Sequence, residues 1–117
     1  MTNCSYIRGD IVLVELVFTQ GGGSKKRPAY IISGNKYHQS RDEVIVAAIT
    51  SNTTSKRVGD TKVKNWQAAG LLFPSLVAGI LQTIKRGSII KKLGRLSASD
   101  ARSVEKSIRT ALALNGK

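Results

Sequence analysis

The stretch GGGSKKRPAY, Gly21 to Tyr30, joins three glycines and a serine to three consecutive cations, directly in front of a proline and an apolar run. Glycines allow a pliable loop, whereas the proline marks the start of a strand. Fixed positive charge at the mouth of a strand suits an anionic ligand, because Lys and Arg donate charge-assisted hydrogen bonds to it. Lys25, Lys26 and Arg27 are therefore the first residues to consider for chemistry.

The charge of the whole chain favours the same class of ligand. Nineteen Lys and Arg stand against seven Asp and Glu, which gives a formal net charge of +12. Such a balance favours polyanionic partners, either nucleic acid or acidic protein segments. The chain is long enough for one domain with its own core, so residues 1–117 are expected to form a single unit in which residues 1–7 are a loose N-terminal arm.

Groups that often serve as bases, nucleophiles or metal ligands are few. His38, the only histidine, lies in the polar segment NKYHQS and is expected to face solvent and to play no part in catalysis. Cys4, the only cysteine, has no partner for an internal disulfide and is expected to be inert. One histidine without clustered cysteines or carboxylates cannot build a zinc site. No metal or cofactor is therefore expected.

The sequence predicts no contact with a membrane. No apolar stretch approaches the ~20 uninterrupted residues of a membrane span. The N-terminal segment MTNCSYIRGD lacks an apolar region typical of secretion signals. A reducing cytoplasm is the expected compartment.

The elements that position the cations are predicted to be short strands. Runs rich in β-branched residues predict strands over residues 11–18, 28–33, 44–50, 76–84 and 88–94, with a shorter one in TKVKNW. The continuous apolar run of residues 44–50 is expected to be covered on both faces. GNKYHQSRDE is expected to be a turn or a short helical turn, and AAGLLFPS a connector in which Trp66 anchors to the core. For residues 76–84 helix is the competing interpretation, but Gly79 and the β-branched ends favour a strand.

A single clear helix follows the strands, in SASDARSVEKSIRTALAL. Ser97 and Asp100 resemble a capping box at its start. Val104, Ile108 and Leu112 recur every four residues and form its apolar face. Short strands with one packed helix predict a mainly β fold, a small curved β-barrel with a C-terminal α-helix.

The chain carries a series of spaced motifs, in the order RGDIVLVEL, KRPAYIISGN, VIVAAITSN, NWQAAGLLFPS, LQTI and KKLGRLS. A glycine-containing loop separates the first two. In their order, these motifs resemble the MazF/PemK family of toxins from bacterial toxin–antitoxin pairs. The resemblance runs from about Arg8 to Leu114, nearly the whole chain.

This resemblance implies an SH3-like barrel related to that of the gyrase poison CcdB, usually as a homodimer. It implies metal-independent endoribonuclease activity on single-stranded RNA. It also implies a cognate antitoxin, acidic and partly disordered, whose extended C-terminal segment blocks the RNA groove.

The family's catalytic pair, carried over onto this chain, is the arginine of the RP motif, Arg27, and the threonine at the end of the third strand, Thr50. Expected RNA contacts are Lys25, Lys26, Ser51 and Gln82. At Gln82 the chain departs from many family members, which carry a charged side chain in the strand before the TI dipeptide. RNA binding or sequence preference is therefore expected to differ.

The two residue types of the pair suit metal-free RNA cleavage. Attack of a 2′-hydroxyl on the adjacent phosphorus adds negative charge to the phosphate oxygens, which the site must stabilise. An arginine offers a planar fork to two of these oxygens, and a threonine offers a short, stiff hydroxyl as a neutral donor. The proton acceptor is left open between water, the arginine and the geometry of the substrate. The products would end in 2′,3′-cyclic phosphate and 5′-hydroxyl.

Other functions remain alternatives. A CcdB-like toxin would bind a topoisomerase and cut nothing, and a non-catalytic barrel would bind nucleic acid through a basic groove and stacking aromatics. Two Phe, three Tyr and one Trp supply a stacking platform poorly. Taken alone, Thr50 and Ser51 are also common strand-end residues that satisfy loop backbone groups.

Overall fold

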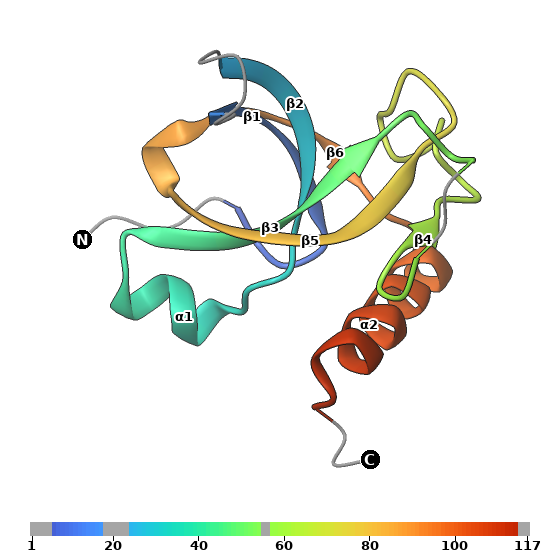
Figure 1. Cartoon of the computed structure of the whole chain (residues 1–117). Helices are drawn as coiled ribbons and strands as arrows, with labels where there is room; N and C mark the ends of the chain where they lie inside the picture. The colour runs from blue at the N-terminus through green and yellow to red at the C-terminus, as the bar shows by residue number, and fades with distance from the viewer. Residues whose placement is uncertain (1–5, 18–23, 55–56, 115–117) are drawn as a thin grey trace.

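The computed structural model describes residues 6–17, 24–54 and 57–114, and its elements are predominantly strands (Figure 1). In chain order they are β1 (Asp10–Val17), β2 (Ser24–Ile31), α1 (Asn35–Ser40), β3 (Glu43–Thr50), β4 (Thr61–Lys62), β5 (Leu76–Lys85), the 3₁₀ turn η2 (Arg86–Ser88), β6 (Ile89–Arg95) and α2 (Ala98–Leu112). The predicted mainly β fold with a C-terminal helix is confirmed. The segment 76–84 is a strand, as Gly79 and the β-branched ends indicated.

The six strands form one antiparallel sheet in the order β4-β5-β3-β2-β1-β6. Register shifts interrupt the β1–β6 and β3–β5 ladders, and such irregularities bend strands. In Figure 1 the sheet accordingly curls, with β3 and β5 side by side and both helices on one side of them. No pairing between β4 and β6 occurs among the described residues, so the curled sheet is barrel-like without being closed.

Two apolar clusters cover the two faces of the curled sheet. One lies between the sheet and α2 and includes Tyr30, Ile49, Val104 and Ile108. The other lies on the opposite face and consists of Val12, Val14, Ala29, Ile31, Val44, Val46, Ile84 and Ile89. Strand β3 contributes to both clusters and has no exposed residue, which confirms that it is covered on both faces.

The C-terminal helix begins as its capping residues predict. The Ser97 hydroxyl accepts a hydrogen bond from the backbone N–H of Asp100 at 3.2 Å. Asp100 does more than complement the helix N-terminus, because its buried carboxylate also accepts from the backbone N–H groups of Lys64 and Asn65, at 3.1 and 2.9 Å. The helix start is thereby tied to the chain that follows β4. Leu112 remains 48% exposed at the far end.

The second strand differs from its prediction. It begins at Ser24 rather than at Pro28, because β1 pairs with it along the whole length, as far as Val17 opposite Ser24. Lys25 and Lys26 are therefore strand residues and not loop residues. Pro28 is accommodated because β3 pairs only with Ala29–Ile31, so no third strand lies beside the proline. The glycines of the expected loop, residues 21–23, lie outside the described residues.

The expected solvent-facing position of His38 is wrong. His38 lies in α1 and is only 5% exposed. Its polar sequence neighbours are exposed, but the short helix turns this one side chain inward, where Nε2 lies 2.6 Å from the buried hydroxyl of Ser33. A polar flanking sequence therefore did not indicate which side chain the helix would bury.

The ends of the chain are described only in part. Cys4 and most of the expected N-terminal arm lie outside the described residues, as does Phe18. Tyr6 packs against the second cluster, and the backbone N–H of Ile7 donates to Asp10 at 3.0 Å. Trp66 is partly buried against the first cluster, in agreement with its predicted anchoring role. Among the described residues, neither helix has the length and apolar character needed to cross a membrane.

Candidate active site

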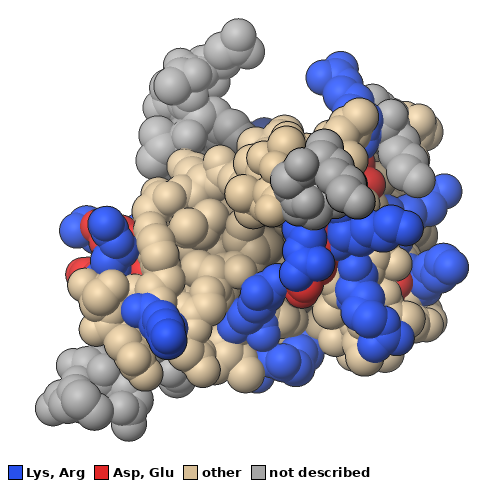
Figure 2. All heavy atoms as spheres, turned by 90° about the horizontal axis from the view of Figure 1, so that it is seen from below, with Lys and Arg blue, Asp and Glu red and all other residues tan. Residues whose placement is uncertain are grey.

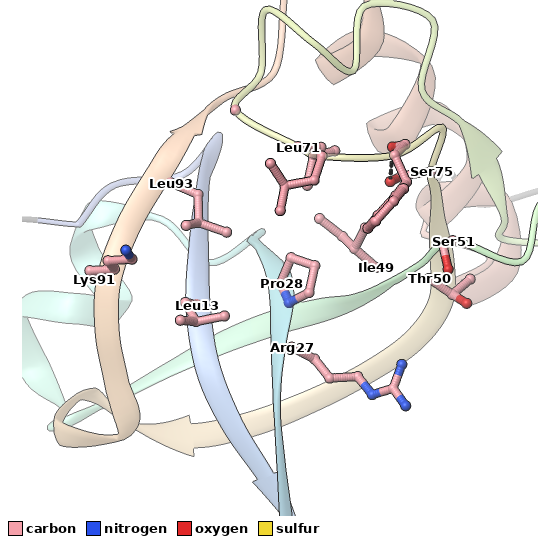
Figure 3. A pocket seen from close by; sticks show the side chains of 13 residues that line it. Leu13, Arg27, Pro28, Ile49, Thr50, Ser51, Leu71, Ser75, Lys91 and Leu93 are labelled. Atoms are coloured by element: carbon pink, nitrogen blue, oxygen red, sulfur yellow. Dashed lines mark hydrogen bonds between the residues drawn. The ribbon is translucent and has the colours of Figure 1, made fainter.

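A groove with a volume of about 450 Å³ opens where β3 ends (Figure 3). One side comes from β1, β2 and β6, and the other from the end of β3 and the connector between β4 and β5. Its lining residues are Leu13, Arg27, Pro28, Ile49, Thr50, Ser51, Gly70, Leu71, Leu72, Phe73, Ser75, Lys91 and Leu93. None of these described lining residues is acidic, so the groove suits an anionic ligand with apolar parts.

The predicted pair, Arg27 and Thr50, meets at this groove. The β2–β3 ladder pairs Ala29 with Ala48 and ends there. Arg27 and Thr50 stand two residues beyond this last pair, one on each strand, and both line the groove. In Figure 3 the Arg27 side chain extends from β2 toward the end of β3. A ligand in the groove can therefore contact both a guanidinium and a hydroxyl.

The Thr50 hydroxyl is held by the turn that follows it. Its oxygen accepts a hydrogen bond from the backbone N–H of Asn52 at 3.1 Å. This is the local role expected of a strand-end threonine. Because the N–H occupies an acceptor position, the hydroxyl proton is left to donate to a ligand in the groove. The structural and the chemical roles of Thr50 are thus compatible.

Lys91 is a groove residue that sequence reasoning missed. It pairs with Leu13, which in turn pairs with Pro28, so it stands on the opposite wall from Thr50. Its neighbour Lys92 instead forms an ion pair at 3.3 Å with the buried carboxylate of Asp10. Alternation along β6 separates the two roles, and only the pairing register identifies which lysine enters the groove.

The apolar wall of the groove was also missed. Leu71 is 7% exposed, whereas the next two side chains, Leu72 and Phe73, are 83% and 62% exposed. The sequence indicated only a turn-rich connector for this segment. Its contribution becomes visible once the connector is seen beside β6 and Pro28.

The four expected RNA contacts lie at different places. Ser51 lines the groove and is exposed. Lys25 and Lys26 are exposed on β2, beyond Arg27, and do not line it. Gln82 pairs with Val46, four residues before Thr50, which is about 13 Å along the strand. The structure therefore brings Ser51, but not Gln82, beside Arg27 and Thr50.

Positive charge is not confined to the groove. Figure 2 shows Lys and Arg gathered on the side of the molecule that carries α2. Exposed bases on this helix are Arg102, Lys106 and Arg109, the last of which pairs with Glu105 at 3.1 Å. Within residues 6–17, 24–54 and 57–114, no three His, Cys, Asp or Glu side chains form a group that could hold a metal ion.

Comparison with known proteins identifies relatives of this fold. The family described as PemK-like, MazF-like toxin of type II toxin–antitoxin system matches residues 7–112. None of the curated proteins matches the chain in sequence.

Three solved structures illustrate the similarity. The Mycobacterium tuberculosis toxin MazF-mt6 superposes with a TM-score of 0.73 at 26% identity, covering 89% of this chain and 96% of that chain. An endoribonuclease in complex with its cognate antitoxin from a mycobacterial species gives 0.74 at 18% identity, covering 94% and 97%. MazE–MazF from Deinococcus radiodurans gives 0.72 at 18% identity, covering 92% and 96%. The last two, at such low identity, are evidence of a shared fold.

Proposed function

Because the chain belongs to the PemK-like, MazF-like toxins of type II toxin–antitoxin systems, we propose that it is an endoribonuclease that cuts single-stranded RNA without a metal ion. Two solved structures that share this fold are endoribonucleases, with which this activity is consistent. The observation that carries the proposal is that Arg27 and Thr50 line the same groove, whose described lining residues include no acidic side chain.

The reaction we propose is an internal transfer at phosphorus. The 2′-oxygen of one nucleotide forms a bond to the adjacent phosphorus while the bond from phosphorus to the 5′-oxygen breaks. The 2′-hydroxyl loses its proton, and the departing 5′-oxygen gains one. The products are a 2′,3′-cyclic phosphate and a 5′-hydroxyl, so no water is consumed in this step.

Arg27 and Thr50 stabilise the charge that this transfer places on the phosphate. The Arg27 guanidinium donates two hydrogen bonds in a plane to phosphate oxygens, and this contact strengthens as negative charge accumulates. Thr50, whose oxygen is fixed by the N–H of Asn52, donates its proton to the same group. Arg27 lies within β2 and Thr50 is the last residue of β3, and strands hold donors more rigidly than loops do.

The positive surface charge and the family to which the chain belongs indicate which partners to expect. The proposed inhibitor is a cognate antitoxin with an acidic, partly disordered segment that orders as it covers the groove. Similar toxins are seen in complexes with antitoxins. We further propose that residues 1–117 act as one toxin domain, assembled as a two-fold homodimer in the cytoplasm.

Purified protein incubated with a long RNA provides the test. New ends found by sequencing at a recurring short motif, each with a 5′-hydroxyl, are the expected result. Intact RNA after prolonged incubation with folded protein would refute the activity. Inhibition of a topoisomerase in the absence of RNA cleavage would indicate the CcdB-like alternative instead.

A further inference from the structure

An exposed aromatic side chain stands at the lip of the groove. Phe73 is 62% exposed and lines the groove beside Leu71 and Leu72. Among the described aromatic residues it alone is exposed, since Tyr6, Tyr37 and Trp66 are half-buried and Tyr30 is buried. Exposing a large apolar ring costs free energy on the order of 25 cal/mol for each Å² left in water. A ligand that covers the Phe73 ring would therefore recover this free energy.

The lip that carries Phe73 is firmly attached to the sheet. A Cβ atom added to Gly70 would lie 2.2 Å from the carbonyl oxygen of Leu93, and one added to Gly94 would lie 2.1 Å from that of Ala69. The connector backbone thus packs directly on β6. The carbonyl of Phe73 itself accepts a hydrogen bond from the Ser75 hydroxyl at 2.7 Å. Phe73 is exposed on a fixed platform, which is the arrangement that preserves a binding surface.

The opposite wall of the groove supplies an apolar floor and a cation. Leu13 and Pro28 are neighbours across β1 and β2, and Lys91 follows Leu13 on β6. Lys91 is therefore two strands away from Pro28, about 10 Å across the sheet. Arg27 stands beside Pro28 at the other border of the same floor. An apolar floor is thus flanked by positive charge on both sides.

Apolar floor, aromatic lip and flanking cations match one unit of single-stranded RNA, a base between two phosphates. Unpaired bases stack on aromatic side chains while cations neutralise the neighbouring phosphates. We propose that the groove between Phe73 and Pro28 holds one unpaired nucleobase next to the cleaved bond, with Phe73 stacked on the base and Lys91 bound to the adjoining phosphate. This inference rests on the proposed ribonuclease function, and it assigns Phe73 and Lys91 to substrate positioning.

An acidic protein segment is the other ligand that a basic groove could accept. It would pair carboxylates with Lys91 and Arg27, but it would not require a π-face at position 73. The experiment must therefore separate stacking from the burial of any apolar group.

Synthetic RNA that contains the mapped cleavage motif provides this separation. Phe73→Ala is expected to raise KM at least tenfold, in the range measured for single base-stacking contacts, with kcat nearly unchanged. Phe73→Tyr should retain the KM of the unaltered protein, and Phe73→Leu should not, because leucine is apolar but has no π-face. Ile80→Ala, which shortens a 66% exposed side chain outside the groove, is the control and should change neither constant. Circular dichroism of each variant verifies folding.

Abasic substitution in the RNA identifies the base. Replacing the stacked nucleotide by an abasic one should raise KM as much as Phe73→Ala does, and the two changes combined should cost no more than either alone. Additive losses at every nucleotide, or equal KM values for Phe73→Ala and unaltered protein, would overturn the inference. Loss of antitoxin binding without loss of RNA binding would assign the groove to a protein segment.

The role of Lys91 has a separate measurement. A cation that binds one phosphate adds about 0.7 to the slope of log affinity against log salt for single-stranded nucleic acid. Lys91→Ala should reduce the slope by that amount, while Lys36→Ala, an exposed lysine on α1, should reduce it much less. Equal slopes for the two variants would contradict the assignment. If the unaltered protein cuts no RNA, the ribonuclease proposal fails. Binding of fluorescent RNA to the same variants, measured by fluorescence anisotropy, then still decides whether the groove between Phe73 and Pro28 binds a base.

Discussion

The hydroxyl oxygen of Ser33 lies 2.6 Å from Nε2 of His38, and both side chains are buried. The same oxygen accepts the backbone N–H of Ile45 at 2.9 Å, so its proton is free to point at the imidazole. Arg86 donates to the carbonyls of His38 and Arg41, at 2.8 Å each. These bonds fasten α1 to β3 and to η2, the turn that follows β5. A hydrogen bond donated by Ser33 to Nε2 requires a neutral His38.

Stability should therefore depend on the charge of His38. Burial, and secondarily the Arg86 guanidinium, lower the pKa of His38 from its usual value of 6.5. The Tyr37 ring meets the imidazole edge-on, and the Arg41 guanidinium lies over the Tyr37 ring, 5.3 Å from its centroid. A lowered folded-state pKa contributes stability that is fully present above about pH 6.5 and is lost as the pH falls toward the folded value.

Urea unfolding at about pH 7.5 and about pH 5.5 tests this dependence. The unaltered protein should lose more stability on acidification than His38→Gln. This substitution replaces the imidazole by an amide, which can form hydrogen bonds but does not titrate. Equal losses for the two proteins would mean that His38 has the same pKa folded and unfolded.

His38 should nevertheless be dispensable for cleavage. The Ser33 hydroxyl beside His38 accepts the backbone N–H of Ile45, which precedes Thr50 by five positions, about 16 Å along β3. An imidazole at that distance transfers no proton to a phosphate held by Thr50. Initial rates of His38→Gln, measured below its unfolding transition, should fall within about twofold of the unaltered protein. A folded but inactive variant would require a proton path from α1 to the groove.

The strands and the helix could be predicted because their signals are local. Residues 44–49 are apolar throughout, and Ser97 precedes a four-residue apolar repeat, so each segment indicates its own structure. The errors arose where a side chain is governed by a distant partner. His38 is buried by contacts with Ser33, and β2 starts at Ser24 because β1 continues beside it.

The candidate site was predictable to the same degree. Arg27 and Thr50 were inferred from a family resemblance, and the pairing register gives their spatial relation. Lys91 and Phe73 belong to segments that carry no distinctive pattern, a KK pair and a turn-rich connector. Their positions depend on the close contact between the connector backbone at Gly70 and the β6 backbone at Gly94. The spacing of apolar residues in one sequence gives no information about such a contact.

The glycine contact between the connector and β6 should be sensitive to a single methyl group. Gly70 has a φ of +86°, and its added Cβ would meet backbone rather than a movable side chain. Gly70→Ala should lower the free energy of unfolding by about 2 kcal/mol or more, from strain at positive φ and from the clash. Urea unfolding at neutral pH measures the loss.

Gly87→Ala is the matched control for this substitution. Nothing lies within 4 Å of a Cβ added at Gly87, and its φ is not in the left-handed region. Its stability should change by less than about 1 kcal/mol. Comparable losses in the two variants would show that the backbone contact contributes little.

Cleavage should proceed in excess EDTA. In the proposed mechanism, Arg27 and Thr50 stabilise the phosphate charge that a divalent cation stabilises in metal-dependent nucleases. RNA fragments formed in EDTA should carry 2′,3′-cyclic phosphate and 5′-hydroxyl ends, detected by labelling with polynucleotide kinase. Activity lost in EDTA and regained with magnesium, or 5′-phosphate ends, would replace this mechanism by attack of an activated water.

The catalytic pair should respond to substitution according to the donors that each residue supplies. Arg27→Ala removes a two-pronged contact that is strongest in the transition state, so kcat should fall roughly a hundredfold or more, about 3 kcal/mol of barrier. Arg27→Lys should restore RNA binding better than kcat, because the charge returns without the planar fork.

Thr50→Val should lower kcat roughly tenfold or more, whereas Thr50→Ser, which keeps the hydroxyl that accepts from Asn52, should lose much less. The four variants would be compared on one synthetic RNA, with circular dichroism to verify folding. Full activity of Arg27→Ala would remove Arg27 from the chemistry and leave Lys91 as the other cation among the described lining residues of the groove.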